Sequence, residues 1–289
     1  MARSLTFTVA PDETFRRVQA ILRARGVSRR LLTRLKMDGG ILRNGEAVRA
    51  IDMTAPGDVL TIFLPEDDAR PSIDFPLDIV YEDEDILVVN KPAGLATHPT
   101  RNHQGVTLAG AVSAHLGGAA FRAIGRLDKG TSGLVLCALH GYAASNLDGR
   151  AQKTYYALVH GEYHGTGTFT GAIYRPKPNC TLRAVRPEGA ESQPGDLPAV
   201  THWEALARAG GVSFLRVTLE TGRTHQIRAH FAAGGTPLVG DDYYGAPPRP
   251  EGRPFLHCGE MAFTHPVTGE NLRFTADLPV EFIAFLGGE

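Results

Sequence analysis

The sequence predicts an α+β protein in which a strand-rich body follows a small helical head. Its 289 residues exceed the usual length of one domain, and 43% of them are apolar, which is enough for a sizeable core. In the body, runs typical of strands cover residues 85–90, 133–139, 155–159 and 214–220, whereas helix patterns cover 107–116 and 224–233. This composition favours a mixed or antiparallel sheet. Polar segments with glycine or proline, residues 165–171 and 187–198, are expected to be loops.

The head, residues 1–64, is expected to hold two short helices and a hairpin. Asp12 is a candidate N-cap for a helix over residues 13–25, and Ser28 for a second helix that ends at Gly39-Gly40. The inner faces of the two helices are predicted to be Phe15, Val18, Ile21, Leu22, Leu31, Leu32 and Leu35. The turn signals that follow are Asn44-Gly45 and Pro56-Gly57-Asp58, the latter leading into a strand over residues 59–64.

Charge is distributed unevenly along the chain. Residues 1–60 carry 11 Lys and Arg against 6 Asp and Glu, while residues 61–89 carry 1 against 9. A basic head is compatible with a polyanionic partner, and equally with a solvated pair of basic helices. Residues 65–76 contain three prolines and several charges, so they are expected to link the head to a body over residues 77–289.

Several classes of protein and site are excluded by the sequence. The three cysteines are far apart and odd in number, which argues against a disulfide framework and predicts a reduced, cytoplasmic protein. The first residues lack the apolar core of a signal peptide, and no apolar run is long enough to cross a bilayer. Phosphate-binding and dinucleotide-binding glycine motifs, the hydrolase nucleophile elbow and the His-Glu-x-x-His zinc motif are absent. A soluble protein without a membrane partner, nucleotide cofactor or metal is therefore expected.

Two segments of the body crowd polar residues between glycines. In residues 125–133, Arg126 and Asp128 would share one face at the end of a strand, because side chains alternate along a strand. In residues 221–228, Thr224 is a candidate cap for a helix from which Arg228 reaches a carboxylate. A cationic partner of this kind would keep a sequestered aspartate ionised. Taken singly, each segment is also compatible with an ordinary turn or an exposed helix arginine.

The head and the body each resemble a known family. The stretch SRRLLTRLKMDGGILRNGEAV with the closing PGDVLTI resembles the S4 RNA-binding module, in which two helices and a sheet present a basic face to structured RNA. Six strings of the body resemble the RluA family of pseudouridine synthases: DEDILVVNKPAGLATHP, GRLDKGTSGL, KTYYALVHG, AVTHWEAL, LETGRTHQIRAHFAAGGTPLVGDDYYG and LHCGEMAFTHPVTGE. The resemblance implies a pseudouridine synthase fold for the body. The reaction would replace the N1–C1′ bond of a uridine in RNA by a C5–C1′ bond, with neither metal nor organic cofactor.

The resemblance also implies roles for particular residues. Asp128 matches the catalytic aspartate that attacks the uridine, and Arg228 matches the arginine that pairs with it. Tyr155 matches the tyrosine that contacts the flipped base and is a candidate for removing the C5 proton. RNA contacts are expected from the body residues Arg126, Thr131, Ser132, Arg223, Thr224, His225 and Gln226, and from the head residues Arg29, Arg30, Arg34 and Lys36. Arg126 is expected to occupy the gap that the extruded base leaves.

The sequence specifies the RNA substrate less closely than it specifies the reaction. Members with such a head usually modify ribosomal RNA of the large subunit, which is the expected target, and transfer RNA is the alternative. A basic head adds affinity that does not depend on sequence. An alternative from another functional class is that the protein is a non-catalytic RNA-binding factor of ribosome assembly. Its one support is Gly125, which stands where the family usually carries a histidine. A monomer is favoured.

Overall fold

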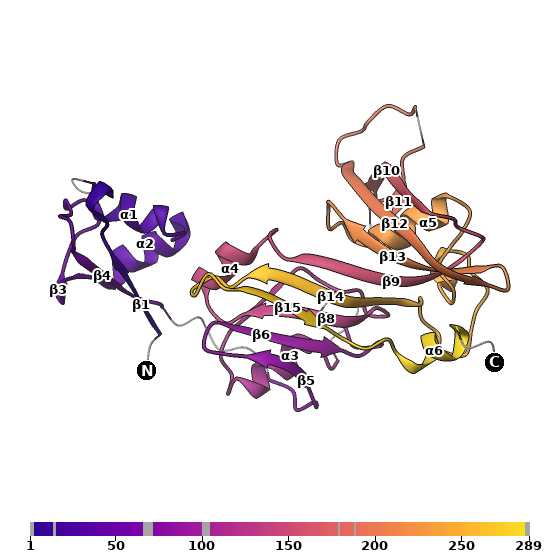
Figure 1. Ribbon diagram of the computed structural model, residues 1–289, viewed down its shortest axis with the longest axis horizontal. Helices are drawn as coiled ribbons and strands as arrows, with labels where there is room; N and C mark the ends of the chain where they lie inside the picture. The colour runs from indigo at the N-terminus through magenta and orange to yellow at the C-terminus, as the bar shows by residue number, and fades with distance from the viewer. Residues whose placement is uncertain are drawn as a thin grey trace.

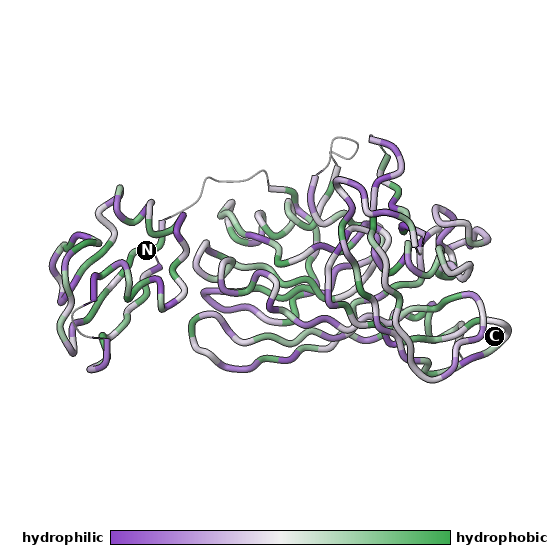
Figure 2. The backbone as a smooth tube through the Cα atoms, turned by 90° about the horizontal axis from the view of Figure 1, so that it is seen from above, coloured by the Kyte–Doolittle hydropathy of each residue, from purple (hydrophilic) through white to green (hydrophobic). Residues whose placement is uncertain are grey.

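The computed structural model describes residues 3–13, 16–65, 72–99, 105–178, 180–187 and 189–286. They form two units side by side, a small N-terminal one and a larger one that carries the C-terminus (Figure 1, Figure 2). Each unit has its own sheet and its own cluster of buried apolar side chains. Among the helices of the described residues, none is long and apolar enough to cross a membrane.

The small unit packs two helices on a four-stranded antiparallel sheet. The strands, in order across the sheet, are β1 (Ser4–Thr8), β4 (Val59–Phe63), β2 (Ile41–Arg43) and β3 (Glu46–Ala47). The helices are α1 (Val18–Ala24) and α2 (Arg29–Asp38). As expected, Ser28 caps α2 by accepting a hydrogen bond from the Leu31 amide, and Gly39 ends it in the left-handed conformation.

The first helix begins later than the sequence predicts. Asp12 does not cap it, because Asp12 lies in a short 3-10 turn, η1 (Pro11–Glu13), and α1 starts only at Val18. Glu13 of this turn forms an ion pair with Arg25, beyond the far end of α1. That contact ties the turn to the end of the helix. Phe15, expected on the inner face, lies outside the described residues.

The larger unit is built on an 11-stranded sheet that is mostly antiparallel. The main path runs through β11 (Ala184–Val185), β10 (Thr166–Tyr174), β12 (Leu197–Ala209), β13 (Val212–Leu219), β9 (Gln152–His160), β14 (Leu256–Thr264), β8 (Ser132–Ala138), β6 (Ile86–Lys91) and β5 (Asp78–Glu82). Two strands lie off this path: β15 (Asn271–Thr275) pairs with β14, and β7 (Arg122–Ile124) with β8. Because β8 and β14 pair in parallel, the sheet is mixed. The predicted α+β class is confirmed.

Residues 165–171 are not the loop that their composition predicts. They lie almost entirely in β10, where Gly167 pairs with Trp203 of β12. A Cβ on Gly167 would lie 2.2 Å from the Trp203 ring, so the glycine marks a close approach of a side chain to the backbone. In the second expected loop, residues 187–198, the only described residues that belong to a strand are Leu197 and Pro198.

Four helices of the larger unit border the sheet (Figure 1). They are α3 (Leu108–His115), α4 (Gly141–Leu147), α5 (Gln226–Ala233) and α6 (Val280–Leu286). α3 buries its apolar residues in the main core, and α5 packs against β10, β11 and β12. A 3-10 turn, η2 (Asp242–Tyr244), packs on α5. The helix predicted at residues 224–233 is thus α5, with a start two residues later.

Polar contacts at β1 and α4 hold the two units together. Arg3 donates two hydrogen bonds to the buried carboxylate of Asp85, each of 3.0 Å. Tyr142 of α4 donates to the backbone carbonyl of Arg25 at 2.7 Å. The Tyr142 ring is buried in the core of the small unit. The larger unit therefore contributes an aromatic side chain to the core of the small one.

Candidate active site

Asp128 lies in the loop that connects β7 to β8. The segment after β6 fixes the backbone of this loop from one side. Thr97 donates a hydrogen bond to the Leu127 carbonyl at 2.7 Å, and the Gly94 amide donates to the Lys129 carbonyl at 2.8 Å. The Asp128 side chain itself is 22% exposed. A rigid loop thus presents a carboxylate that still meets solvent.

A buried lysine supports the same loop. Lys91 is 1% exposed, and its ammonium group donates to the carbonyls of Pro92 and Leu95, with the Lys129 carbonyl 3.5 Å away. Burial lowers the pKa of Lys91 to about 7, while the charge of Asp128 opposes that fall. A single lysine at the end of a strand is usually a surface residue, so no local signal in the sequence distinguishes this one.

Arg228 of α5 faces Asp128, but its main partner is another aspartate. Its Nε and Nη2 each donate to one oxygen of Asp241 at 2.7 Å, and its Nη1 reaches Oδ2 of Asp128 at 3.3 Å. Arg228 and Asp241 are 8% and 1% exposed, so they form a buried two-point ion pair. Burial opposes the charge of Arg228, but the hydrogen bonds and charge of Asp241 outweigh it and raise the pKa of Arg228. Asp241 thereby fixes the plane of the guanidinium group and leaves Nη1 for Asp128.

His225 approaches the same oxygen of Asp128. It immediately precedes α5 and has a left-handed backbone with a φ of 57°. Its Nε2 lies 3.7 Å from Oδ2 of Asp128, and its Nδ1 lies 3.0 Å from the Tyr244 hydroxyl. Burial lowers the pKa of His225, and Asp128 acts in the opposite direction. Thr224 does not cap α5 as predicted; its hydroxyl accepts a hydrogen bond from Arg126 at 2.8 Å.

Tyr155 of β9 lines the same cleft. Its side chain is buried, and burial raises the pKa of its phenol well above the usual value. The ring therefore stays neutral near pH 7, available to stack on a flat group or to form a hydrogen bond. The cleft is lined by Arg126, Leu127, Asp128, Thr131, Tyr155, Leu219, Arg223, His225, Gln226, Ile227, Arg228 and Leu256.

Two of the residues predicted to contact RNA form hydrogen bonds inside the protein. Ser132 is buried, and its hydroxyl lies 2.9 Å from Nδ1 of His257, which joins β8 to β14. Gln226 is also buried, and its amide donates to the Val200 carbonyl and the Thr201 hydroxyl, which fastens α5 to β12. The polar atoms of both side chains are thus paired inside the protein, and Gln226 also lines the cleft. An RNA contact by either residue stays a prediction.

The other predicted contacts divide between the two units. Arg126, Thr131, Arg223 and His225 line the cleft, and Thr224 bonds to Arg126. Arg29, Arg30, Arg34 and Lys36 lie on α2 of the small unit. Asp241 and Tyr244 were not predicted as site residues from the sequence. Their one local signal is the string Gly240-Asp-Asp-Tyr-Tyr-Gly245, which places acidic and aromatic residues between two glycines.

Comparisons with known proteins place this site in a family. The family model for RNA pseudouridylate synthase matches residues 85–233, a range that includes Asp128, Tyr155 and Arg228. The uncharacterized RNA pseudouridine synthase YjbO of Bacillus subtilis is 37% identical to this chain, and the alignment covers 91% of this chain and 96% of YjbO. The chain belongs to the RNA pseudouridine synthase family. Ribosomal large subunit pseudouridine synthase D of Vibrio parahaemolyticus is 35% identical and covers 89% of this chain and 85% of its own length.

Solved structures support the same fold for the larger unit. Human RNA pseudouridylate synthase domain containing 1 aligns with a TM-score of 0.57 and 26% identity, over 76% of this chain and 98% of its own. Human RNA pseudouridylate synthase domain containing 4 aligns with a TM-score of 0.60 and 21% identity, over 72% of this chain and 91% of its own. The resemblance to the RluA family is confirmed, and the synthase is an isomerase that acts on uridine in RNA.

Gly125 of the synthase stands where a histidine is usual, and both its backbone conformation and its neighbour Lys153 favour glycine there. Its φ is 74°, a left-handed value that favours glycine. A Cβ at this position would lie 2.8 Å from Nζ of Lys153, a half-buried residue whose ammonium group donates to the Ile124 carbonyl at 3.0 Å. Burial lowers the pKa of Lys153. The glycine thus accompanies a lysine that fills the adjacent space, and it does not alter the contacts of Asp128 described above.

Replacing Gly125 by histidine should therefore destabilise the synthase. The left-handed backbone alone costs a non-glycine residue about 1–2 kcal/mol, and displacement of Lys153 adds to it. Urea unfolding measures the loss. Gly149→His is the matched control, since Gly149 has a φ of 70° and a Cβ added there would meet nothing within 4 Å. Equal losses in the two variants would contradict a role for Lys153.

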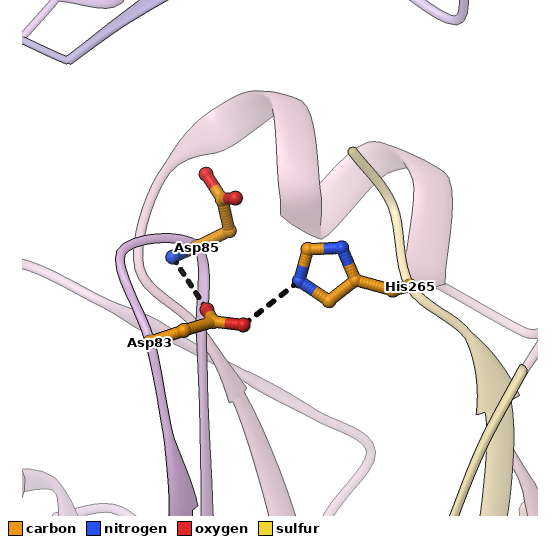
Figure 3. Close-up of side chains that lie close together, drawn as sticks. All are labelled: Asp83, Asp85 and His265. Atoms are coloured by element: carbon orange, nitrogen blue, oxygen red, sulfur yellow. Dashed lines mark hydrogen bonds and ion pairs between the residues drawn. The ribbon is translucent and has the colours of Figure 1, made fainter. Parts of the chain in front are cut away.

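Asp83, Asp85 and His265 form a separate cluster with the composition of a metal site (Figure 3). Their polar atoms, however, already contact other groups of the protein. Nδ1 of His265 accepts hydrogen bonds from two backbone amides, so its ring proton lies on Nε2, which is 3.1 Å from Oδ2 of Asp83. A nitrogen that carries a proton has no lone pair for a metal. The third member, Asp85, is already held by Arg3 and by His140. The cluster therefore connects strands and units and offers no ready cation site.

Proposed function

We propose that this synthase uses Asp128 as the nucleophile in isomerising uridines of large-subunit ribosomal RNA. The observation that carries the proposal is the pairing of Asp128 with Arg228, whose charge is held by Asp241. A nucleophilic carboxylate must be ionised and accessible. Arg228 places a positive charge 3.3 Å from Oδ2 of Asp128, and the 22% exposure of the Asp128 side chain leaves it open to a ligand.

The walls of the cleft suit a planar base. Tyr155 supplies a neutral ring for stacking beside Asp128. Thr131 supplies a buried hydroxyl that has no hydrogen-bond partner among the described residues. An unpaired buried hydroxyl is costly, so a polar edge of the base would be bound favourably there. In this proposal Tyr155 also lies close enough to the base to take part in removal of the C5 proton.

Arg126 is proposed to act at the mouth of the cleft. It is exposed, and its guanidinium group donates to Thr224 on the other side of the cleft. A base must leave its stack to reach Asp128, at a cost of about a few kcal/mol. Arg126 would leave Thr224 and occupy the space that the base vacates, which offsets part of this cost.

The RNA class is proposed from the relatives. The Vibrio parahaemolyticus relative is named a ribosomal large subunit pseudouridine synthase, and it covers most of this chain. The small unit, with its basic α2, is proposed to be an S4-like RNA-binding domain over residues 1–64, joined by the linker 65–76 to the catalytic domain. We also propose that the synthase acts as a monomer in the cytoplasm, where its three cysteines stay free thiols.

Mapping of pseudouridine at nucleotide resolution tests this proposal. The synthase is incubated with transcripts of large-subunit ribosomal RNA, with partly assembled subunits and with transfer RNA. We expect new pseudouridines in the ribosomal RNA or its particles. Product in transfer RNA alone would refute the substrate class. No product in any RNA that the protein binds would refute the activity of this chain and favour an assembly factor.

Removing charge from α2 should weaken RNA binding at low salt. Arg29→Gln with Arg30→Gln removes two exposed positive charges of the small unit without disturbing its core. Each phosphate contact that is removed lowers the slope of log affinity against log salt by about 1. The matched control is Arg216→Gln with Arg273→Gln, two exposed strand arginines whose ion pairs among the described residues are with Glu204 and Glu260. A slope that is the same in both double variants would count against an RNA contact at α2.

A further inference from the structure

Tyr244 determines which nitrogen of His225 carries the proton. The oxygen of the Tyr244 hydroxyl accepts a hydrogen bond from the Arg183 amide at 3.0 Å, and it lies 3.0 Å from Nδ1 of His225. Among the described residues, Nδ1 is the only acceptor that the hydroxyl proton reaches. Nδ1 is therefore an acceptor, and the proton of the neutral ring lies on Nε2.

The Nε2 proton of His225 points toward the proposed nucleophile. Nε2 lies 3.7 Å from Oδ2 of Asp128, the same oxygen that Nη1 of Arg228 approaches at 3.3 Å. No described residue donates a hydrogen bond to Oδ1 of Asp128. Two donors thus converge on one oxygen of the carboxylate and leave the other without a partner.

We infer that His225 is a positioning residue that, together with Arg228, holds Oδ2 of Asp128 so that Oδ1 is the oxygen that reacts. The inference deepens the proposed function and rests on Asp128 being the nucleophile. At 3.7 Å the contact between His225 and Asp128 is longer than a hydrogen bond in the free enzyme. Such contacts commonly shorten when substrate closes the site.

The backbone of His225 supports this role. Only two described residues other than glycine have a positive φ, His225 and Asn44. Asn44 lies in the predicted hairpin turn, where asparagine is favoured. A positive φ is uncommon for histidine as for other residues with a side chain, so the conformation at the start of α5 is less favourable locally than a right-handed one. The hydrogen bond with Tyr244 and the placement of the ring beside Asp128 give this conformation a function.

Two adjacent tyrosines make a matched test. Tyr244→Phe removes the proton that fixes the His225 ring and keeps the aromatic ring 4.9 Å from the Arg228 guanidinium carbon. We expect the single-turnover rate to fall about 10-fold, since Nε2 of His225 is no longer fixed as a donor toward the Asp128 carboxylate, with RNA affinity unchanged. Tyr243→Phe is the control, because the Tyr243 hydroxyl bonds to Thr181 of the same segment but not to His225. Equal rates for the two variants would overturn the inference.

A second variant and a spectrum separate positioning from folding. His225→Asn tolerates the left-handed backbone but lacks the ring, so we expect an unchanged melting temperature and a single-turnover rate about 10- to 100-fold lower. Nitrogen-15 spectra of labelled histidine should show the Nε2-protonated form of His225 in the wild type and a mixture of forms in Tyr244→Phe. An Nδ1-protonated ring in the wild type would overturn the inference.

The proposed function and this inference fail differently. If Asp128→Asn abolishes product while His225→Asn and Tyr244→Phe turn over at the wild-type rate, His225 has no positioning role and the proposed function stands. If Asp128→Asn turns over at the wild-type rate, the proposed function itself is wrong.

Discussion

Asp128→Asn should abolish pseudouridine formation while leaving the synthase folded. The amide of asparagine is a poor nucleophile, and loss of a covalent catalytic group typically lowers rates by about 10⁴-fold or more. Arg228 keeps its two hydrogen bonds to Asp241, so no buried charge is left unpaired. The ion pair between Asp128 and Arg228 is partly exposed, and its removal should change stability by no more than about 1 kcal/mol. Single-turnover assays with excess enzyme measure the rate.

The control for this variant is the same chemical change elsewhere. Asp78 is exposed on β5, and Asp78→Asn should retain the wild-type rate. RNA binding by Asp128→Asn should also persist, because the phosphate contacts are separate from the reacting group. A substantial residual rate in Asp128→Asn would mean that another residue attacks the uridine.

Asp241→Asn should produce the largest loss of stability in the site. Asp241 neutralises a buried guanidinium group, and its replacement leaves the Arg228 charge with only the more distant and partly exposed Asp128 as an anionic partner. Breaking a buried ion pair in this way costs about 3–5 kcal/mol. Activity should fall as well, because Arg228 is no longer held in the plane that directs Nη1 to Asp128. Equilibrium unfolding in urea and single-turnover rates measure the two effects.

The neighbouring residue provides the control for Asp241. Asp242 is exposed in η2, so Asp242→Asn should change stability little. A double variant, Asp241→Leu with Arg228→Met, should recover stability but not activity, because it removes both charges together. If Asp241→Asn and Asp242→Asn have the same stability, the Arg228 charge does not depend on Asp241.

Local signals in the sequence predicted much of the secondary structure. The apolar runs at residues 85–90 and 133–139 became β6 and β8, and Ser28 caps α2 as its position indicates. Residues 165–171 were wrongly predicted to form a loop. Gly167 lies in a strand because the Trp203 ring packs against its backbone, and this tertiary contact leaves no local signal in the sequence. The order of strands across the sheet was likewise beyond prediction from a single sequence.

The candidate site, like the fold, was only partly predictable from the sequence. The motifs identified Asp128, Tyr155 and Arg228, which the structure brings to one cleft. The partner that holds Arg228 in place was not identified, because many aspartates occur in the chain and only the fold selects Asp241. The internal contact of Ser132 was not predicted either: it bonds to His257, 125 positions away, and this contact is visible only once β8 and β14 are paired.

Release of tritium from C5 of uridine is the most direct test of the account. The isomerisation replaces the C5–H bond by a bond to C1′, so each product formed from uridine labelled at C5 in large-subunit ribosomal RNA releases its label. We predict release by the wild type and none by Asp128→Asn, with both proteins bound to the RNA. No release by the wild type from RNA that it binds, or equal release by the two proteins, would contradict the account.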